Sequence, residues 1–188
     1  MNKVKSIIIM SIITILFLAT NVYAYENDIF KMDVPHDYVE MSYSGLYTFV
    51  KSEEKGIVVY TIKAEGLKKD ISTMSQSEVK ELIGKVVSDD VNIIQQKKEK
   101  LGKAKALKAR VLNDDTYIDM YILVSDKHIL LVSFAAPTES ELDSEEYLEI
   151  KKSFKMKEKT TNATFVKIGI GALACVGGVL KFKNRFMP

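Results

Sequence analysis

The residues that could carry chemistry in this chain are few, because it has two histidines and one cysteine. His36 follows Pro35 in an expected loop and His128 follows a turn, so either could titrate near neutral pH and act as a general base. The alternative for both is a solvated loop histidine, since no serine or cysteine motif announces a nucleophile. A single cysteine excludes an intrachain disulfide, and two histidines do not build the usual Cys/His zinc site.

Motifs of several enzyme classes are missing from the sequence. It contains no Gly-x-Ser-x-Gly nucleophile elbow, no Gly-x-x-x-x-Gly-Lys phosphate loop and no His-Glu-x-x-His zinc motif. Asp114, Asp115 and Asp119 could suggest a calcium site, but they lack the glycine and the closing glutamate of an EF-hand loop. Residues 113–115 are better explained as a hairpin turn. We therefore expect a protein that is not an enzyme, with no catalytic residue, cofactor or metal.

A basic stretch is the most informative polar feature of the chain, with Glu99 as its one acidic residue. Its seven members are Lys97, Lys98, Lys100, Lys103, Lys105, Lys108 and Arg110. Such a stripe could contact anionic lipid or a cell-wall polyanion. Alternation of basic residues with Ala104, Ala106 and Ala109 also fits a strand with one solvated face, or a protected sheet edge, that needs no ligand. The seven residues are candidate contacts to an anionic surface.

Composition and charge place the chain among folded proteins that do not bind nucleic acid. Its 188 residues are 47% hydrophobic and 28% charged, and the net charge is +2. The two ends carry basic residues without acidic ones, which leaves 20 basic and 25 acidic residues in 25–158 and a net charge of −5 there. Because the basic character comes from the ends, nucleic acid is not an expected partner.

The first 24 residues have the layout of a secretory signal peptide. Two lysines precede an apolar run over 7–19, and Val22 and Ala24 suit the −3 and −1 positions of signal peptidase, so we expect cleavage before Tyr25. The alternative is an uncleaved signal anchor, although the apolar run is short for a membrane span. No cysteine lies near the cleavage point, which argues against a lipoprotein.

A second apolar segment near the C-terminus predicts a transmembrane helix over 163–181. Residues 159–162 would form a tether, and 182–188 a basic cytoplasmic tail, because basic residues remain on the cytoplasmic side. The segment is interrupted by Lys167, so a buried or re-entrant helix is the alternative. Neither a sortase motif nor the apolar end of a GPI signal is present. These features predict a single-pass type I protein of the cell membrane, with residues 25–158 extracytoplasmic.

Small residues at helical spacing give the predicted span a side on which another helix could pack. They are Gly171, Ala174, Cys175 and Gly178. A homodimer through the transmembrane helix, or a membrane partner, is therefore a candidate interaction. Small residues are common in membrane helices, so a passive anchor is the alternative.

Residues 25–158 read as one α+β domain. The surest helix follows the capping box Ser75–Glu78 and carries apolar residues at Val79, Leu82, Ile83, Val86 and Val87. A second helix is expected to start at 138–141, with Leu142, Leu148, Ile150 and Phe154 on its apolar side. The expected strands are 29–35, 46–51, 57–63, 91–96, 104–112, 117–124 and 129–134, with Gly56 in a left-handed turn position and Gly102 marking a turn. Runs of neighbouring strands favour one antiparallel sheet flanked by two main helices.

Several short motifs of the domain together resemble the PsbP-like family. They are 30–35 with Tyr38, the strand entry 101–104, the segment 130–137 and the closing 150–154. The resemblance covers most of 28–156 and implies an α/β/α sandwich around an antiparallel sheet, used for binding or assembly far more often than for catalysis. It transfers no functional residue, and the C-terminal span departs from the usual soluble or lipid-anchored members.

The function that we predict is that of a membrane-anchored, non-catalytic binding or assembly accessory domain of the cell envelope. Its expected partners are the membrane and another envelope protein. The alternative is a binder of a small apolar or anionic envelope ligand, such as a lipid or wall polyanion, held between sheet and helices.

Overall fold

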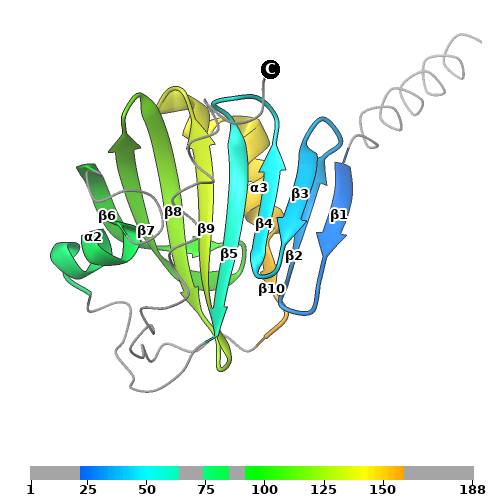
Figure 1. The fold of residues 1–188 in the computed structure, drawn as a ribbon, viewed down its shortest axis with the longest axis horizontal. Helices are drawn as coiled ribbons and strands as arrows, with labels where there is room; N and C mark the ends of the chain where they lie inside the picture. The colour runs from blue at the N-terminus through cyan, green and yellow to red at the C-terminus, as the bar shows by residue number, and fades with distance from the viewer. Residues whose placement is uncertain (1–21, 64–73, 85–91, 159–188) are drawn as a thin grey trace, which may run out of the picture.

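The computed structural model describes residues 22–63, 74–84 and 92–158 (Figure 1). Ten strands, two α-helices and a short 3-10 helix are found there. The strands are β1 (Val22–Glu26), β2 (Phe30–Pro35), β3 (Val39–Tyr43), β4 (Leu46–Val50), β5 (Gly56–Lys63), β6 (Asn92–Leu101), β7 (Ala104–Asn113), β8 (Thr116–Val124), β9 (His128–Ala136) and β10 (Lys155–Met156). The helices are α2 (Gln76–Gly84), η2 (Ser140–Asp143) and α3 (Glu145–Ser153).

The strands form two antiparallel sheets instead of the single sheet that we predicted. The large sheet has seven strands in the order β3-β4-β5-β9-β8-β7-β6, which Figure 1 shows side by side. The small sheet has the order β1-β2-β10. Because β1, β3 and β10 were not among the expected strands, the sequence pattern did not reveal the second sheet.

The two faces of the large sheet bury separate clusters of side chains. On one face, alternate residues such as Met120 and Ile122 of β8 pack with Val79 and Ile83 of α2. On the other, Tyr121 and Leu123 belong to a cluster that includes residues of α3 and of the small sheet. Strand side chains alternate between faces, so α2 and α3 lie on opposite sides of the sheet. The predicted helix-flanked antiparallel sheet is therefore confirmed.

Helix α2 begins with the predicted capping box. The backbone N–H of Ser75 donates to Glu78 Oε2 at 2.8 Å, and the backbone N–H of Glu78 donates to Ser75 Oγ at 3.3 Å. This reciprocal pair satisfies two of the N–H groups that a helix start leaves free. Val79 and Ile83 are fully buried, as their spacing predicts, whereas Val86 and Val87 lie outside the described residues.

The second predicted helix is divided in two. Residues 140–143 form η2, and Ser144 then caps α3 by accepting a hydrogen bond from the backbone N–H of Tyr147. Leu142, Ile150 and Phe154 are buried as expected, but Leu148 is 42% exposed. The break at Ser144 changes the helical phase, which explains why one continuous helical stripe did not place Leu148 correctly.

The two predicted turn glycines act in different ways. Gly102 lies in the β6–β7 turn, as predicted, and has φ = +58°. Gly56 has no positive φ, so its predicted left-handed role is wrong, although the β4–β5 hairpin is correct. A Cβ at Gly56 would lie 2.9 Å from the Phe49 carbonyl oxygen. Close approach of the neighbouring strand is the reason for glycine there.

The predicted membrane segments lie mostly outside the described residues. No helix within 22–63, 74–84 and 92–158 is long and apolar enough to cross a bilayer. Residues 159–188, with the expected tether, span and tail, are not among them. The expected cleavage point before Tyr25 falls inside β1, whose residues pair with β2 from Val22 to Glu26.

Candidate functional site

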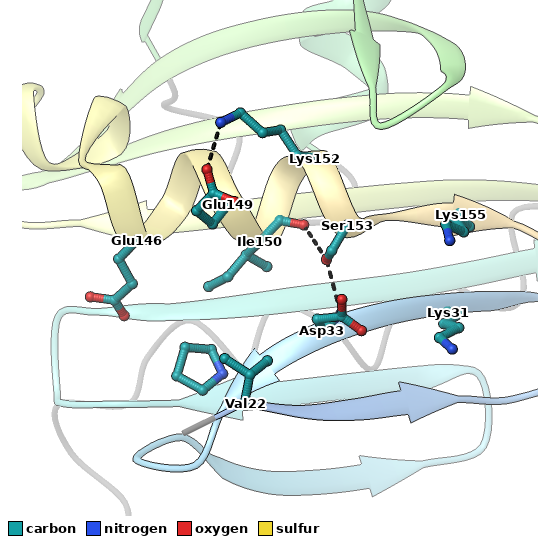
Figure 2. A pocket seen from close by; sticks show the side chains of 10 residues that line it. Val22, Lys31, Asp33, Glu146, Glu149, Ile150, Lys152, Ser153 and Lys155 are labelled. Carbon is teal, nitrogen blue, oxygen red and sulfur yellow. Dashed lines mark hydrogen bonds and ion pairs between the residues drawn. The ribbon is translucent and has the colours of Figure 1, made fainter. Parts of the chain in front are cut away.

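A groove of about 640 Å³ runs between α3 and the small sheet (Figure 2). Its lining residues come from β1, β2, α3 and β10 and are Val22, Lys31, Asp33, Pro35, Glu146, Glu149, Ile150, Lys152, Ser153 and Lys155. Most of these side chains carry a charge, of either sign. A groove of this composition suits a polar or charged partner better than an apolar ligand.

Ser153 joins the two walls of the groove. Its hydroxyl donates to the Ile150 carbonyl oxygen at 2.7 Å and accepts from the backbone N–H of Asp33 at 2.9 Å, as Figure 2 shows. β10 is only two residues long, and its pairs with β2 are formed at Phe30 and Lys31. The serine therefore supplies, for Asp33, the hydrogen bond that a longer β10 would have supplied.

Glu146 marks the acidic end of the groove and is held by three donors. Lys51 and Lys55 each place Nζ 3.0 Å from Glu146 Oε2, and the Tyr38 hydroxyl donates to Oε1 at 2.7 Å. Partial burial would raise the pKa of Glu146, but the hydrogen bonds from Tyr38, Lys55 and Lys51 outweigh it and lower that pKa. Glu146 is thus an ionised structural carboxylate.

The basic end of the groove holds two lysines on neighbouring strands. Lys31 of β2 lies directly opposite Lys155 of β10 in the sheet register. Like charges in this position repel each other. Glu26 Oε2 lies 3.7 Å from Lys31 Nζ, and Glu26 Oε1 lies 3.0 Å from Lys157 Nζ. The groove therefore has two lysines beside β10, whereas the carboxylate at its other end, Glu146, is paired with cations.

A buried ion cluster lies beside the groove, under η2 and α3. We use the name Asp119 cluster for Asp119, Lys108, Arg110 and Lys151. Asp119 Oδ1 accepts from Arg110 Nε at 2.7 Å, and Asp119 Oδ2 lies 2.8 Å from Lys108 Nζ and 2.9 Å from Lys151 Nζ. Burial alone would raise the pKa of Asp119, but these cations lower it to about 2. Asp119 is therefore ionised at neutral pH.

The cluster connects the large sheet to both helical elements above it. Arg110 also reaches Glu139 Oε1 at 3.0 Å and Asp143 Oδ1 at 2.9 Å, while Lys151 Nζ donates to the Leu142 carbonyl oxygen at 2.6 Å. Every one of these contacts joins β7 or α3 to the segment around η2. The cluster thus fixes η2 and α3 against β7 and β8.

Aromatic rings enclose the cationic side of the cluster. Lys151 Nζ lies 5.8 Å from the Tyr121 ring centroid, 5.1 Å from that of Phe134 and 5.9 Å from that of Tyr147. Burial lowers the pKa of Lys151, and the charge of Asp119 opposes that shift. All three rings are buried, so aromatic side chains fill the space between the large sheet and α3.

The structure separates the seven candidate residues of the basic stretch. Lys97, Lys98, Lys100, Lys103 and Lys105 are exposed, whereas Lys108 is 3% exposed and Arg110 is 7% exposed. The alternation that predicted one solvated face does not hold at Lys108 and Arg110, because they lie on the opposite face of β7 from Lys105, and η2 and α3 cover that face. The contact of the stretch with an anionic surface remains a prediction.

Neither histidine has the side-chain arrangement that is typical of a hydrolase active site. His36 packs its ring against Tyr23, with centroids 5.5 Å apart. His128 Nδ1 lies 2.8 Å from Glu158 Oε1, and the Ser125 hydroxyl donates to the other oxygen of the same carboxylate. In a catalytic triad the histidine stands between serine and carboxylate. Here the carboxylate stands between the other two, so the three residues close the β8–β9 turn.

Of the remaining predicted sites, the aspartates lie among the described residues and the packing residues of the span do not. Asp114, with φ = +50°, lies in the β7–β8 turn, as the hairpin interpretation of 113–115 predicts, while Asp119 is held by cations. No group of metal-ligating side chains is found among the described residues. Gly171, Ala174, Cys175 and Gly178, the candidate packing residues of the span, lie outside them.

Comparison with solved structures identifies the fold. The solution structure of cyanobacterial PsbP (CyanoP) from Synechocystis sp. PCC 6803 matches with a TM-score of 0.55 and 14% identity, over 72% of this chain and 92% of CyanoP. The described domain has the PsbP-like fold. The resemblance predicted from the sequence motifs is therefore confirmed at the level of the fold. At this identity the match says nothing about shared ligands or partners.

The other comparisons add little to this result. A protein from Bacteroides thetaiotaomicron matches more loosely, with a TM-score of 0.43 and 15% identity, over 69% of this chain and 46% of the other. Neither known sequence families nor curated proteins give a match.

Proposed function

We propose that this chain is a membrane-anchored extracytoplasmic domain that binds or assembles with another protein of the cell envelope and does not catalyse a reaction. The observation that carries the proposal is the PsbP-like fold over 72% of the chain. In the family that the sequence motifs resemble, this fold serves binding or assembly far more often than catalysis. The predicted leader and C-terminal span support the placement, since together they would leave the domain outside the membrane.

The way in which the domain uses its charged residues supports a binding role over a catalytic one. Three carboxylates could serve as acids or bases: Asp119, Glu146 and Glu158. Each is engaged by cations or hydroxyls that hold secondary-structure elements together. A general base needs a free lone pair directed at a substrate. The groove instead presents charges of both signs along α3, which suits the charged surface of a protein partner.

Cross-linking of the tagged full-length protein in its own cells tests the proposal. Two altered chains accompany it: one ends at Glu158 and is secreted, and the other carries leucine at Gly171, Ala174 and Gly178. A single envelope protein captured by all three forms assigns binding to the outer domain. Capture that is lost in both altered forms moves binding into the span. If all three forms capture nothing specific, the proposed assembly role is wrong.

A second candidate function, contact with an anionic lipid or wall polyanion, is favoured by the exposed lysines of the β6–β7 hairpin. Lys98, Lys100 and Lys105 are exposed, and Lys100 lies directly opposite Lys105 in the register. Binding of the secreted form to vesicles with and without anionic lipid tests it. The triple change of these lysines to glutamate should abolish binding, whereas glutamate at Lys152 and Lys155, on the other face, should not.

A further inference from the structure

The two edges of the large sheet differ in how they are protected from pairing with other chains. β6, at one edge, carries Lys97, Lys98 and Lys100, and its register with β7 shifts between Ile93 and Gln95. Lysines and bulges are the features by which natural edge strands prevent further pairing. The β6 edge is therefore protected against further strand pairing, and we call it the guarded edge.

β3, at the other edge, has none of these guards. Its sequence, Val-Glu-Met-Ser-Tyr, contains no lysine and no proline, and its five pairs with β4 run without a register shift. Val39 is 65% exposed and Tyr43 is 74% exposed, the largest exposures among the large hydrophobic residues of the described chain. Within the described residues β3 pairs with β4 alone, so its outer backbone edge remains open.

The sequence of β3 is complementary to itself. If two copies pair antiparallel about a two-fold axis at Met41, Val39 lies opposite Tyr43 of the other copy and Glu40 lies opposite Ser42. The first pair joins a β-branched side chain to an aromatic ring, which is a favourable cross-strand pair. The second keeps the two glutamates apart and puts a hydroxyl opposite each carboxylate. In one chain the Ser42 hydroxyl already donates to Glu40 Oε1, at 2.8 Å.

The layer beneath β3 leaves its side chains accessible. Glu40 and Ser42 lie opposite Phe49 and Tyr47 of β4, and hence on the face that packs against the small sheet. Both are nevertheless exposed, although β1 lies near them: burial and then the charge of Glu40 raise the pKa of both Tyr23 and Tyr25. Val39, Met41 and Tyr43 point to the opposite face, away from the small sheet.

We propose that β3 is a homodimerisation edge, on which a second copy of this chain pairs antiparallel with Met41 at the two-fold axis. Pairing continues the large sheet from one copy into the other. The occupant is a second copy and not a foreign strand, because the register that buries Val39 and Tyr43 also separates the only charges on the strand. This interface is independent of the proposed envelope partner and of the predicted transmembrane helix.

Oligomeric state and disulfide trapping of the full chain in a non-ionic detergent test the proposal. In a Cys175→Ser background, Met41→Cys should form a covalent dimer on mild oxidation, because the Cα atoms of directly opposite residues are about 4.5–5.5 Å apart, within the range of a disulfide. Lys98→Cys on the guarded edge is the matched control and should remain monomeric. Met41→Lys places two like charges at the axis and should raise the dimer dissociation constant about tenfold.

Several results would overturn the proposal. A monomer at all concentrations would do so, as would equal cross-linking through positions 41 and 98. A dimer that survives Met41→Lys but is lost in Gly171→Leu would place the interface in the predicted span instead. Because Met41 is on a half-exposed edge strand, circular dichroism of Met41→Lys should be unchanged, which separates loss of pairing from unfolding.

Discussion

Asp119 has no exposed surface and accepts hydrogen bonds from Arg110 and Lys151, while Lys108 Nζ lies 2.8 Å away. A buried ion pair contributes little net stability over well-packed apolar residues, but loss of one partner leaves the others charged and desolvated. Removing this carboxylate is therefore destabilising, because its three cationic partners stay buried without their counterion. At the scale of single residues, Asp119 is the position where a small change has the largest effect.

Asp119→Asn keeps the shape of the side chain and removes its charge, and should lower the free energy of unfolding by about 3–5 kcal/mol. Urea denaturation measures this difference. Asp143→Asn is the matched control, because Asp143 binds the same Arg110 but its side chain is 56% exposed. The control should cost less than about 1 kcal/mol. Equal losses in the two variants would show that Asp119 does not hold the cluster together.

The dependence of the free energy of unfolding on pH should also report the charge of Asp119. The pKa of Asp119 falls from 3.8 to about 2 on folding, so its contribution is complete above pH 4 and is lost as the pH falls toward 2. The loss should reach about 2 kcal/mol, and it should be missing from Asp119→Asn. Parallel pH profiles for wild type and variant between pH 4 and pH 2 would contradict the assignment.

One signal in the sequence points to this cluster, although we did not predict it. An aspartate within the apolar run 117–124 indicates a buried charge with a partner, because an unpaired one is too costly. The partners could not be predicted from the pattern of β7. We expected all the basic residues on one solvated face, but strand parity places Lys108 and Arg110 with Ala104 and Ala106, opposite Lys105. Parity alone does not tell which face α3 will cover, because that depends on tertiary packing.

Elements far apart in the sequence meet at the β6–β7 turn. Gly102 has φ = +58°, and a Cβ there would lie 1.9 Å from the Phe154 carbonyl oxygen, just after α3 ends. The turn is thus packed against the end of α3, and only glycine satisfies both the backbone conformation and the contact. Gly45, with φ = +75°, has its nearest such atom at 3.2 Å.

Gly102→Ala should therefore destabilise the domain by about 2–4 kcal/mol, which combines left-handed strain with the clash against α3. Gly45→Ala has the strain but little of the clash, and should cost about 1–2 kcal/mol. Thermal and urea denaturation of both variants checks the order. A smaller loss for Gly102→Ala than for Gly45→Ala would mean that the turn does not support α3.

Elements were predictable where they carry strong local signals. The capping box at Ser75 and the strands with long apolar runs, such as 117–124, were placed correctly. β3 and β10 were missed because one has five residues and lies solvated at a sheet edge, and the other has two residues and exists only through its pairs with β2. β1 was missed because its residues cross the expected leader boundary. Strands defined by their partners leave no local pattern to read.

At the scale of the whole molecule, the route by which the chain leaves the domain predicts how the domain stands on a membrane. The backbone N–H of Lys157 donates to the Ile29 carbonyl oxygen, and Glu158 contacts the β8–β9 turn. The expected tether of four residues reaches about 14 Å when extended. If the span follows at 163, the β8–β9 turn must face the bilayer.

The β4–β5 turn should then face away from the membrane. β5 pairs with β9 from Gly56, beside that turn, to Lys63, beside the β8–β9 turn. Eight residues of strand separate the two ends by about 25 Å. Lys127 and Glu53 are exposed residues at the near and far ends.

Fluorescence energy transfer should report this orientation. A fluorophore is attached to Lys127→Cys or to Glu53→Cys, in a Cys175→Ser chain reconstituted into vesicles with a lipid-linked acceptor. Energy transfer should be strong from position 127 and weak from position 53, because the tether holds one end near the bilayer and the sheet is stiff. Lengthening the tether by ten glycine-serine residues should reduce the difference between the two labels. Equal transfer from both positions in the unmodified chain would indicate a domain that lies flat on the membrane, as a retained N-terminal anchor would require. Val22 and Ile29 lie at opposite ends of the small sheet. Anchors at both chain ends would therefore draw the sheet parallel to the membrane.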